Sequence, residues 1–374
     1  MSFGEFRGVW VSTTLNLDYP SQKGLNVQKL RDEAVALLDS AQQMGLNAVL
    51  LQVRPCGDAL YPSELYPWSQ YLSGVQGQGP EDGFDPLAYW IEQAHQRGME
   101  LHAWINPFRV TQGGTPKNPK QDVTELAENN PARLHADWTV AYTDGNLYLN
   151  PGIPEVRAYI QDGVREILEN YAVDGIHFDD YFYPGEDFND AAAFSAYGEG
   201  FSDIGDWRRG NIDSLISETH ALVQSVKPGA RFGVSPFAIW QNLSSSPQGS
   251  DTRGLESYRT HYTDTRKWVK SEWLDYIAPQ IYWNIGNTAA DYAKLLSWWV
   301  DVVKDTKVDL YIGQAGYRSL EAEPGDVWYG SDELKRQIQL NRMYDQVKGS
   351  IHFRLGMYLQ SQELVSALKS LYLS

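Results

Sequence analysis

Eight strand-like runs alternate with helix-like stretches along the chain, and this repeat restricts the possible folds most strongly. The runs cover residues 6–12, 48–54, 100–106, 175–180, 231–237, 276–283, 310–315 and 351–358. Strand and helix repeated eight times predict an α/β protein with a single domain, residues 5–374, folded as a (β/α)8 TIM barrel. An open doubly wound sheet would require a glycine-rich phosphate loop after the first strand, and the residues after Ser12 contain no such loop.

The stretches between these runs have the periodicity and the end signals of helices. Residues 27–44 keep apolar side chains on one face and stop at Gly45, and residues 154–169 begin with a proline, which suits a first helical turn. The same pattern predicts helices at 87–96, 212–226, 292–303 and 334–347.

Four segments that follow strands are long, polar and rich in aromatic residues. They cover 55–85, 108–152, 181–210 and 238–260, whereas the connections at the other end of the barrel are short. Long loops at the carboxyl ends of barrel strands are typical of a binding cleft at that face. We therefore expect the functional site there.

The composition limits the class of partner. The formal net charge of −17 argues against nucleic acid and anionic membrane surfaces. No apolar run approaches the roughly 20 residues that cross a bilayer, so membrane insertion is not expected. The chain has 13 Trp and 23 Tyr; many belong in a core, and those in polar loops would suit stacking on a sugar ring. A monomer is the default expectation.

No motif indicates a cofactor or a metal. The single cysteine, Cys56, excludes an intrachain disulfide, and the seven histidines have no zinc-ligand spacing. The chain contains no phosphate-binding loop, no dinucleotide fingerprint and no Gly-x-Ser-x-Gly turn of a serine hydrolase. Neither a cofactor nor a metal is expected.

Two adjacent acids, Asp179 and Asp180, end the fourth strand-like run. Charge at the end of a buried strand costs folding free energy unless it is solvated or paired, and barrel enzymes carry out chemistry at this end. Alternation along the strand turns His177 and Asp179 toward the barrel interior, opposite Ile176 and Phe178. A turn with two surface acids is the alternative, but polar residues that recur on neighbouring strands favour a functional site.

Neighbouring strands also direct polar or aromatic side chains inward. His102 and Asn106 share one face of the third run, Arg54 lies on the inward face of the second, and Gln280 and Tyr282 lie on that of the sixth. Barrel interiors are usually packed with branched aliphatic residues, so a polar upper layer indicates a ligand. A self-satisfied network of buried hydrogen bonds is the alternative, and the inward histidines are either general bases or core residues.

Two further residues complete the expected site. Arg54 is expected to support a carboxylate, either in a fixed ion pair or in ligand binding. Asp58, in the loop directly after the second run, is the second acid expected near the cleft. A metal held by the inward histidines and the paired acids is the rival chemistry, and the lack of His-x-His spacing argues against it.

Seven motifs, spread in order over nearly the whole chain, share one family pattern. They lie at 6–11, 53–61, 101–109, 148–152, 174–184, 233–237 and 278–283. Together they resemble the bacterial glycosyl-hydrolase-like family 10, formerly a domain of unknown function. The resemblance implies a (β/α)8 barrel, usually exported to the cell envelope, that acts on glycan. Members have been linked to bacterial cell-wall polysaccharide, including peptidoglycan strands that lack stem peptides.

Two more distant likenesses concern Asp179. The fourth run is similar to the Asp-Gly-x-Asp-x-Asp-x-Glu motif of family 18 chitinases, but His177 stands at the middle acid and Tyr181 at the catalytic glutamate. Substrate-assisted chemistry is therefore not expected. The run is also similar to that of family 13 amylases, where an Asp ending strand 4 is the nucleophile. The amylase acid after strand 5 has no counterpart in residues 235–237.

We predict a glycoside hydrolase that uses two carboxyl groups, one to protonate the leaving oxygen and one to attack or to activate water. Asp179 is the expected nucleophile or base, Asp180 its partner and Asp58 the reserve. The residues expected to bind the polysaccharide are Arg54, His102, Asn106, His177, Tyr183, Trp240, Gln280, Tyr282 and Trp283. The alternatives are a metal-dependent deacetylase or hydrolase and a non-catalytic glycan-binding module on a degenerate barrel, which the missing strand-5 acid motivates.

The location of the protein is expected from the family resemblance alone. Residues 1–4 do not form a signal peptide. The resemblance implies export to the periplasm, the cell envelope or the medium, with a signal peptide outside this sequence.

Overall fold

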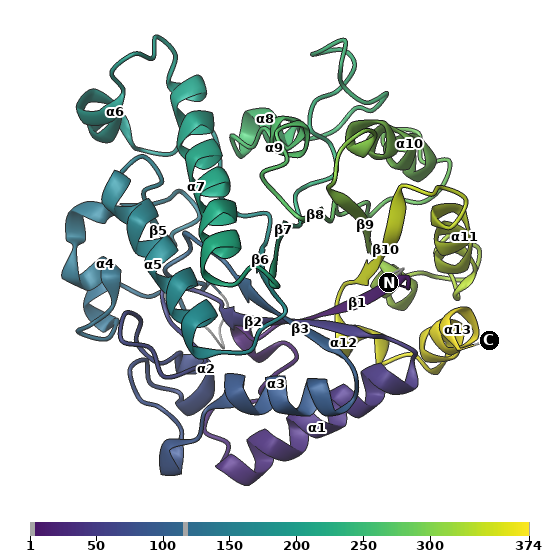
Figure 1. Cartoon of the computed structure of the whole chain (residues 1–374), viewed down its shortest axis with the longest axis horizontal. Helices are drawn as coiled ribbons and strands as arrows, with labels where there is room; N and C mark the ends of the chain where they lie inside the picture. Colours follow the sequence, from purple (N-terminus) through teal and green to yellow (C-terminus); the bar gives the residue numbers. More distant parts are fainter. Residues whose placement is uncertain (1–3, 115–118, 374) are drawn as a thin grey trace.

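Eight parallel strands close into a barrel in the computed structural model, which describes residues 4–114 and 119–373 (Figure 1). The strands are β1 (Phe6–Val11), β2 (Ala48–Arg54), β3 (Glu100–Ile105), β6 (Gly175–Phe178), β7 (Arg231–Val234), β8 (Tyr276–Ile277), β9 (Asp309–Gln314) and β10 (Val347–His352). Around the barrel they follow the order β1, β10, β9, β8, β7, β6, β3, β2. The predicted (β/α)8 fold is therefore confirmed.

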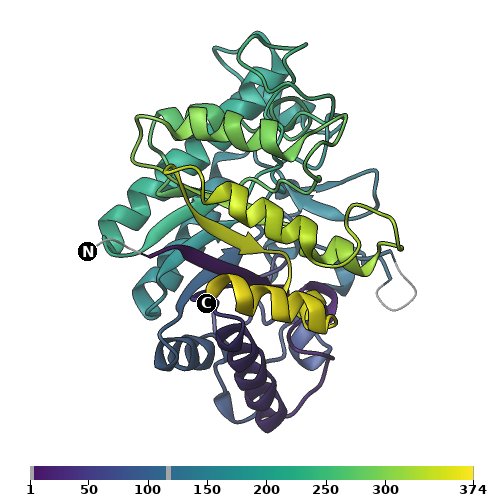
Figure 2. The same cartoon turned by 90° about the vertical axis from the view of Figure 1, so that its right-hand side faces the viewer.

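Helices cover the outside of the barrel (Figures 1 and 2). They are α1 (Val27–Gln43), α3 (Pro86–Gln96), α5 (Pro154–Asn170), α7 (Ile204–Val226), α9 (Thr265–Lys270), α10 (Tyr292–Val303), α11 (Asp332–Asn341) and α13 (Gln362–Tyr372). The Asn26 side chain caps α1 by accepting a hydrogen bond from the Lys29 amide. The periodicity did not predict α13, which completes the ring of helices beside α1. There Tyr372 of α13 packs on Gly45, just after α1.

Side chains alternate between two apolar clusters, one outside the barrel and one inside. Ile176 and Phe178 belong to the outer cluster, between strands and helices, whereas His177 between them contacts the inner cluster. The inner cluster contains Phe6, Trp10, Ala48, Leu50, Trp104, Tyr276, Ala278, Tyr311 and Ile351. Aromatic rings thus fill much of an interior that aliphatic residues usually fill. The predicted inward faces of β3 and β6 are confirmed.

The end of the barrel sequence differs from the prediction. β10 covers Val347–His352 rather than 351–358, and Leu355–Tyr358 forms the short helix α12. A short apolar run does not distinguish a strand from a buried helical turn, which explains the error. α11 ends at Asn341 rather than at residue 347, because Val347 already pairs with Leu310 of β9. α7 begins eight residues earlier than predicted, at Ile204 instead of 212.

Proline shortens two strands at the functional end of the barrel. β7 stops at Val234 and β8 at Ile277, well before the predicted ends at 237 and 283. Pro236 and Pro279 have no N–H group to donate, so the hydrogen-bond ladder breaks beside them. Beyond this point only isolated bridges remain, at Gln280. The chain after these strands can therefore bend around a cavity.

The long segments follow β2, β3, β6 and β7, at the carboxyl ends of the strands, as predicted. They contain α2 (Gln70–Ser73), α4 (Pro131–Leu134), the hairpin of β4 (Thr139–Ala141) and β5 (Leu147–Leu149), α6 (Ala191–Tyr197) and α8 (Ser257–Thr260). Three parts of the sequence lie outside the described residues: 1–3, 115–118 and 374. The first belongs to the segment considered as a signal peptide, and Ser374 is the last residue of the predicted domain. Within that part, no helix combines the length and the apolar character needed to cross a membrane.

Candidate active site

A cavity of about 320 Å³ opens at the carboxyl ends of the barrel strands. Its wall consists of Trp10, Ser12, Thr14, Leu17, Gln52, Trp104, Arg109, Asp179, Asp180, Tyr181, Ser235, Phe237, Gln280, Tyr282 and Phe353. We call this cavity the cleft. It lies at the face where barrel enzymes carry out chemistry, and both predicted acids of strand 4 belong to its wall.

Asp179 is fixed by three hydrogen-bond donors and is only 4 % exposed. Its Oδ2 accepts hydrogen bonds from Trp104 Nε1 and Asn106 Nδ2, both at 3.1 Å, and its Oδ1 accepts one from the Tyr181 amide at 3.2 Å. Burial raises the pKa of Asp179, while the charge of Arg109 and these hydrogen bonds oppose the rise. The geometry suits a carboxylate that must stay in one orientation.

Asp180 also lines the cleft, although alternation along a straight strand would turn it away. β6 ends at Phe178 and the chain bends at Asp180, so that both acids reach the same cavity. Burial and the adjacent charge of Asp179 raise the pKa of Asp180. Two neighbouring carboxyl groups titrate as a pair, with one proton retained after the first is lost. The pair can therefore supply an acid and a base at the same pH.

Arg109 is the one basic residue in the cleft wall, counting the residues that the structure describes. Its amide donates to Asn106 Oδ1 and its Nε donates to the Pro55 carbonyl, each at 3.0 Å. Its charge opposes the rise in the pKa of both acids. The prediction did not select Arg109, although it stands three residues after Asn106 in one of the seven motifs.

Gln280 and Tyr282 line the cleft, as expected from the sequence. Gln280 Nε2 donates to the Ser235 carbonyl at 2.8 Å. The hydroxyl group of Tyr282 is buried in the wall, with no partner among the described residues. A buried hydroxyl without a partner costs free energy, so this group is available to the polar groups of a ligand.

Arg54 lies outside the cleft, contrary to the prediction. The pairing of β2 with β3 shifts register between Gln52 and Arg54, which reverses the alternation and turns Arg54 toward the helices. Its guanidinium lies 4.0 Å from the centre of the Tyr66 ring and packs on Gly163 of α5. Gln52, before the shift, keeps its inward direction and lines the cleft.

His102 and His177 point into the barrel as predicted, but both lie beneath the cleft and neither belongs to its wall. Both are fully buried, and burial lowers the pKa of each. Nδ1 of His102 and Nδ1 of His177 lie 3.0 and 2.9 Å from the Tyr276 hydroxyl. These contacts favour the alternative in which the two are hydrogen-bonded core histidines.

Asp58, the reserve acid, does not line the cleft either. Its Oδ1 accepts a hydrogen bond from the Cys56 amide at 3.2 Å, within the loop that follows β2. Burial raises the pKa of Asp58 to about 6. Across residues 4–114 and 119–373, no group of three or more His, Cys, Asp or Glu side chains could hold a metal ion.

The three aromatic residues predicted to stack on sugar also lie outside the cleft wall. Tyr183 is fully buried, Trp240 stacks on Trp298 with ring centres 6.0 Å apart, and Trp283 packs against the outer cluster. The aromatic residues of the wall are Trp10, Trp104, Tyr181, Phe237, Tyr282 and Phe353. Alternation along β1 and β3 gives a usable signal for the two tryptophans, and Tyr282 was predicted from the sixth run. Tyr181, Phe237 and Phe353 stand in bent segments that have no period.

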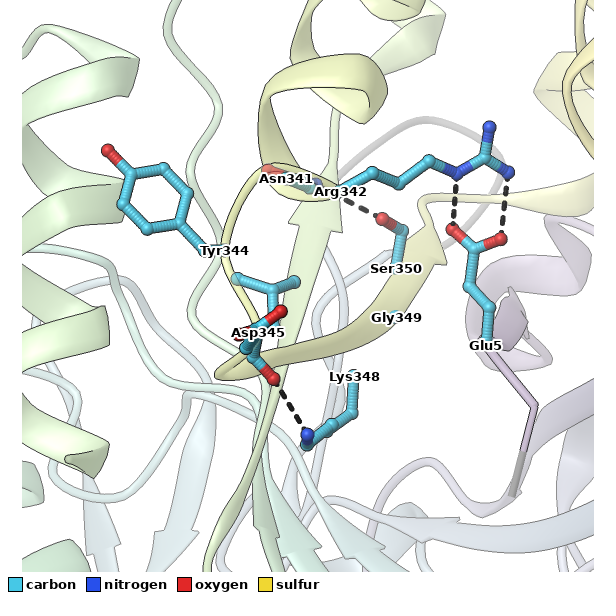
Figure 3. Close-up of a pocket in the computed structure, with 9 residues that line it drawn as sticks. Glu5, Asn341, Arg342, Tyr344, Asp345, Lys348, Gly349 and Ser350 are labelled. Atoms are coloured by element: carbon cyan, nitrogen blue, oxygen red, sulfur yellow. Dashed lines mark hydrogen bonds and ion pairs between the residues drawn. The ribbon is translucent and has the colours of Figure 1, made fainter. Parts of the chain in front are cut away.

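A hollow at the opposite end of the barrel differs from the cleft, because its polar groups pair with one another. It has a volume of about 330 Å³ and lies where α11 meets β10 (Figure 3). Arg342 donates two hydrogen bonds to Glu5, at 3.0 and 2.7 Å, and Asn341 donates to Ser350 at 3.2 Å. Such a wall has few groups left for a ligand, so the cleft is the stronger candidate.

The fold is that of a TIM barrel, and the known proteins that the chain resembles support a glycosidase-type function. The chain belongs to the family described as glycosyl hydrolase-like 10, whose model matches residues 5–329. The chain is 47 % identical over 358 residues to glycosyl hydrolase YngK of Bacillus subtilis, covering 94 % of this chain and 68 % of that protein. It is 42 % identical over 386 residues to glycosyl hydrolase DigH of Escherichia coli K12, covering 97 % and 86 %.

Solved structures share the fold at low sequence identity. The glycoside hydrolase domain of PgaB (BpsB) from Bordetella bronchiseptica matches with a TM-score of 0.58 and 15 % identity, over 100 % of both chains. The endo-β-1,4-mannanase of Thermotoga petrophila matches with a TM-score of 0.55 and 12 % identity, over 94 % of this chain and 68 % of that chain. The family that the seven motifs predict is confirmed.

Proposed function

We propose that this protein hydrolyses glycosidic bonds of bacterial cell-wall polysaccharide and that Asp179 and Asp180 carry out the reaction. One observation carries the proposal: two adjacent carboxyl groups, both with a raised pKa, share a cleft at the carboxyl face of the barrel. Membership of the glycosyl hydrolase-like family supports the class of reaction.

The surroundings of the two acids divide their roles. Asp179, held by three donors and opposed by Arg109, is the member that ionises more readily, so it attacks the anomeric carbon or activates a water there. Asp180, whose pKa rises further because of the charge beside it, keeps the proton and gives it to the leaving oxygen as the glycosidic bond breaks.

The remainder of the wall suits a sugar. Trp10 and Trp104 present aromatic surface for the apolar face of a ring. The free hydroxyl group of Tyr282 can hydrogen-bond to a sugar hydroxyl. Both kinds of contact recur in carbohydrate sites, where a few placed polar groups fix orientation in an otherwise apolar pocket.

The substrate class rests on the family pattern of the seven motifs. We propose peptidoglycan glycan strands, including strands without stem peptides, as the substrate, and an exported protein that meets them in the cell envelope. The acidic surface, with a formal net charge of −17, suits neither nucleic acid nor anionic membranes.

Product analysis tests this function. The protein is incubated with stem-free peptidoglycan strands, with intact peptidoglycan and with chitin oligosaccharides, and new reducing ends are measured with and without a chelator. We expect release from stem-free strands that the chelator does not change. Binding to glycan without any release would favour the non-catalytic module, and loss of activity with the chelator would favour the metal-dependent alternative.

A further inference from the structure

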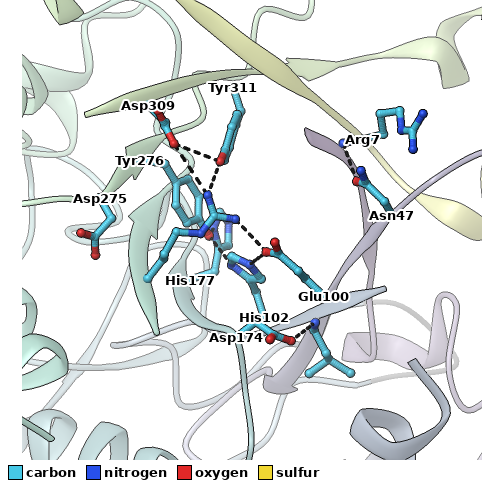
Figure 4. Close-up of polar contacts among 12 residues, drawn as sticks. Arg7, Asn47, Glu100, His102, Asp174, His177, Asp275, Tyr276, Asp309 and Tyr311 are labelled. Carbon is cyan, nitrogen blue, oxygen red and sulfur yellow. Dashed lines mark hydrogen bonds and ion pairs between the residues drawn. The ribbon is translucent and has the colours of Figure 1, made fainter. Parts of the chain in front are cut away.

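Five polar side chains form a continuous line through the barrel, from Ser235 in the cleft wall to Glu100 at the opposite end. Figure 4 shows His177, Tyr276, His102 and Glu100 of this line. The Ser235 hydroxyl lies 2.9 Å from His177 Nε2, and His177 Nδ1 lies 2.9 Å from the Tyr276 hydroxyl. That hydroxyl lies 3.0 Å from His102 Nδ1, and His102 Nε2 lies 3.0 Å from Glu100 Oε2. We call these five residues the interior chain.

Trp10 fixes the direction of the first hydrogen bond. Its indole Nε1, which can only donate, lies 3.2 Å from His177 Nε2. His177 Nε2 must therefore accept, and it carries no proton. Burial lowers the pKa of His177 well below its usual range, so the ring is neutral and its single proton resides on Nδ1. The Ser235 hydroxyl lies 2.9 Å from the same unprotonated nitrogen, so it donates to the ring and shares the single Nε2 lone pair with the Trp10 N–H.

The same reasoning fixes the rest of the interior chain. His177 Nδ1–H donates to the Tyr276 hydroxyl, which therefore gives its own proton to His102 Nδ1. The neutral ring of His102 then carries its proton on Nε2 and donates it to Glu100. Although burial opposes it, the His102 hydrogen bond and the charge of Arg231, 2.7 Å away, lower the pKa of Glu100 to about 2. An ionised carboxylate thus anchors the far end.

Every proton of the interior chain points away from the cleft, and this determines what Ser235 presents to it. Its hydroxyl proton is directed to His177, so the oxygen of Ser235, a residue of the cleft wall that is 1 % exposed, has lone pairs but no proton left for a ligand. We propose that Ser235 contacts the bound sugar and that the interior chain holds its hydroxyl as an acceptor, which selects a donor group of the substrate. The donor would be a sugar hydroxyl or the N–H of an N-acetyl group.

This inference rests on the proposed function only in naming a sugar as the ligand. Ser235 is the residue that touches substrate, and His177, Tyr276, His102 and Glu100 act through it as positioning residues. Because the tautomers and the binding of a glycan are measured without turnover, failure of the inference and failure of the hydrolase proposal can be distinguished.

Nitrogen NMR of the histidine side chains tests the interior chain directly. In the full-length protein labelled with ¹⁵N-histidine, we expect a neutral Nδ1–H ring for His177 and a neutral Nε2–H ring for His102. Assignment uses the loss of each signal in single His→Gln variants. A protonated Nε2 on His177, or a charged ring on either histidine, would overturn the proposed direction.

A double-mutant cycle tests the contact with sugar. Binding of stem-free peptidoglycan fragments is measured by calorimetry for wild type, Ser235→Ala, Tyr276→Phe and the double variant. Loss of one neutral hydrogen bond predicts roughly five- to tenfold weaker binding for Ser235→Ala. Tyr276→Phe should weaken binding less and should add nothing in the Ser235→Ala background, because Tyr276 acts through Ser235.

The control is Ser225→Ala on α7, where the hydroxyl donates to the Leu222 carbonyl far from the cleft; it should bind like wild type. Unchanged affinity of Ser235→Ala would overturn the inference. If the effects of Ser235→Ala and Tyr276→Phe on the binding free energy are additive, the coupling is overturned and Tyr276 has a structural role only. A wild-type protein that binds no glycan would overturn the sugar contact, while the NMR result on the interior chain would stand.

Discussion

The two acids of the cleft are neighbours in sequence, yet their surroundings differ. Asp179 receives hydrogen bonds from Trp104, Asn106 and the Tyr181 amide, and these stabilise the ionised form. For Asp180, burial is the largest influence, and the charge of Asp179 adds to it. The different surroundings thus favour the ionised form of one aspartate and the protonated form of the other.

The pH dependence of hydrolysis should therefore be bell-shaped. Asp179 must be ionised, so the rate falls as the pH drops through its pKa; Asp180 must be protonated, so the rate falls as the pH rises through its higher pKa. In Asp180→Asn we expect kcat to fall about 10²–10⁴-fold and the alkaline limb to disappear. Rates of reducing-end release between pH 4 and pH 10 measure both; an alkaline limb that survives would assign the acid to another group.

The charge of Arg109 provides an independent test at the residue scale. Because this charge holds down the pKa of Asp179 against the effect of burial, Arg109→Gln should move the acid limb of the profile to higher pH. Thermal unfolding serves as the control for folding, since the Nε of Arg109 also donates to the Pro55 carbonyl. An acid limb that stays in place would show that Asp179 does not define it.

The prediction was correct where the alternation of a strand continues for a few residues past its end, and it was wrong where the backbone departs from that alternation. Asp179 and Gln280 could be predicted because apolar neighbours mark the inward face. Arg54 was assigned to the wrong side by a single register shift, which leaves no trace in the residue pattern. Arg109 lies in a loop, where position depends on contacts such as the one with Pro55 rather than on periodicity.

At the scale of strands, two glycines make room for the interior chain. Gly175 pairs with His102 in the β3–β6 register, and Gly233 pairs with Tyr276 in the β7–β8 register. A Cβ atom at Gly233 would lie 2.2 Å from the Tyr276 ring, and one at Gly175 would lie 2.4 Å from His102 Nδ1. The rings of Tyr276 and His102 thus occupy the space that a side chain at Gly233 or Gly175 would need.

Gly233→Ala should therefore destabilise the protein by about 1–3 kcal/mol, as overpacking of a rigid core does. It should also weaken glycan binding, because the Tyr276 ring must move. Gly229→Ala, in the turn before β7, is the matched control, since a Cβ atom there meets no atom within 4 Å. Chemical denaturation measures both variants. Equal stability of the two would mean that the interior adapts to the added methyl group at no cost.

Strand boundaries show the limits of prediction at this scale. The helices with clear caps, such as α1 and α10, match the prediction almost to the residue. β7 and β8 end earlier than predicted because Pro236 and Pro279 interrupt the hydrogen-bond ladder. The positions of these prolines in the sequence could have predicted both strand ends. α12 was predicted as a strand, since a short run with buried Leu355 and Tyr358 fits either element until the tertiary neighbours are known.

At the scale of the whole molecule, the two ends of the chain close the barrel. β10 pairs with both β1 and β9, and the Arg7 guanidinium donates to the Tyr372 carbonyl of α13. Glu5, just before β1, pairs with Arg342, just after α11. The family model ends at residue 329, before β10, so the matched region alone does not form a closed sheet.

A chain cut after Tyr329 should consequently fail to fold. It would lose β10 and leave β1 and β9 as open edges, and it would lose the apolar faces of α11 and α13. We expect no cooperative thermal unfolding by circular dichroism and association in gel filtration, in contrast to the full chain. Cooperative unfolding of the shortened chain near the wild-type midpoint would show that barrel closure is dispensable.

The catalytic role of the acid pair is tested most directly by comparing wild type with Asp179→Asn and Asp180→Asn on stem-free peptidoglycan strands. Release of reducing ends is measured beside glycan binding by calorimetry. We expect both variants to bind within a fewfold of wild type while the rate of release falls at least about 10²-fold. Wild-type rates in either variant would contradict the assignment of this acid pair as the catalytic groups.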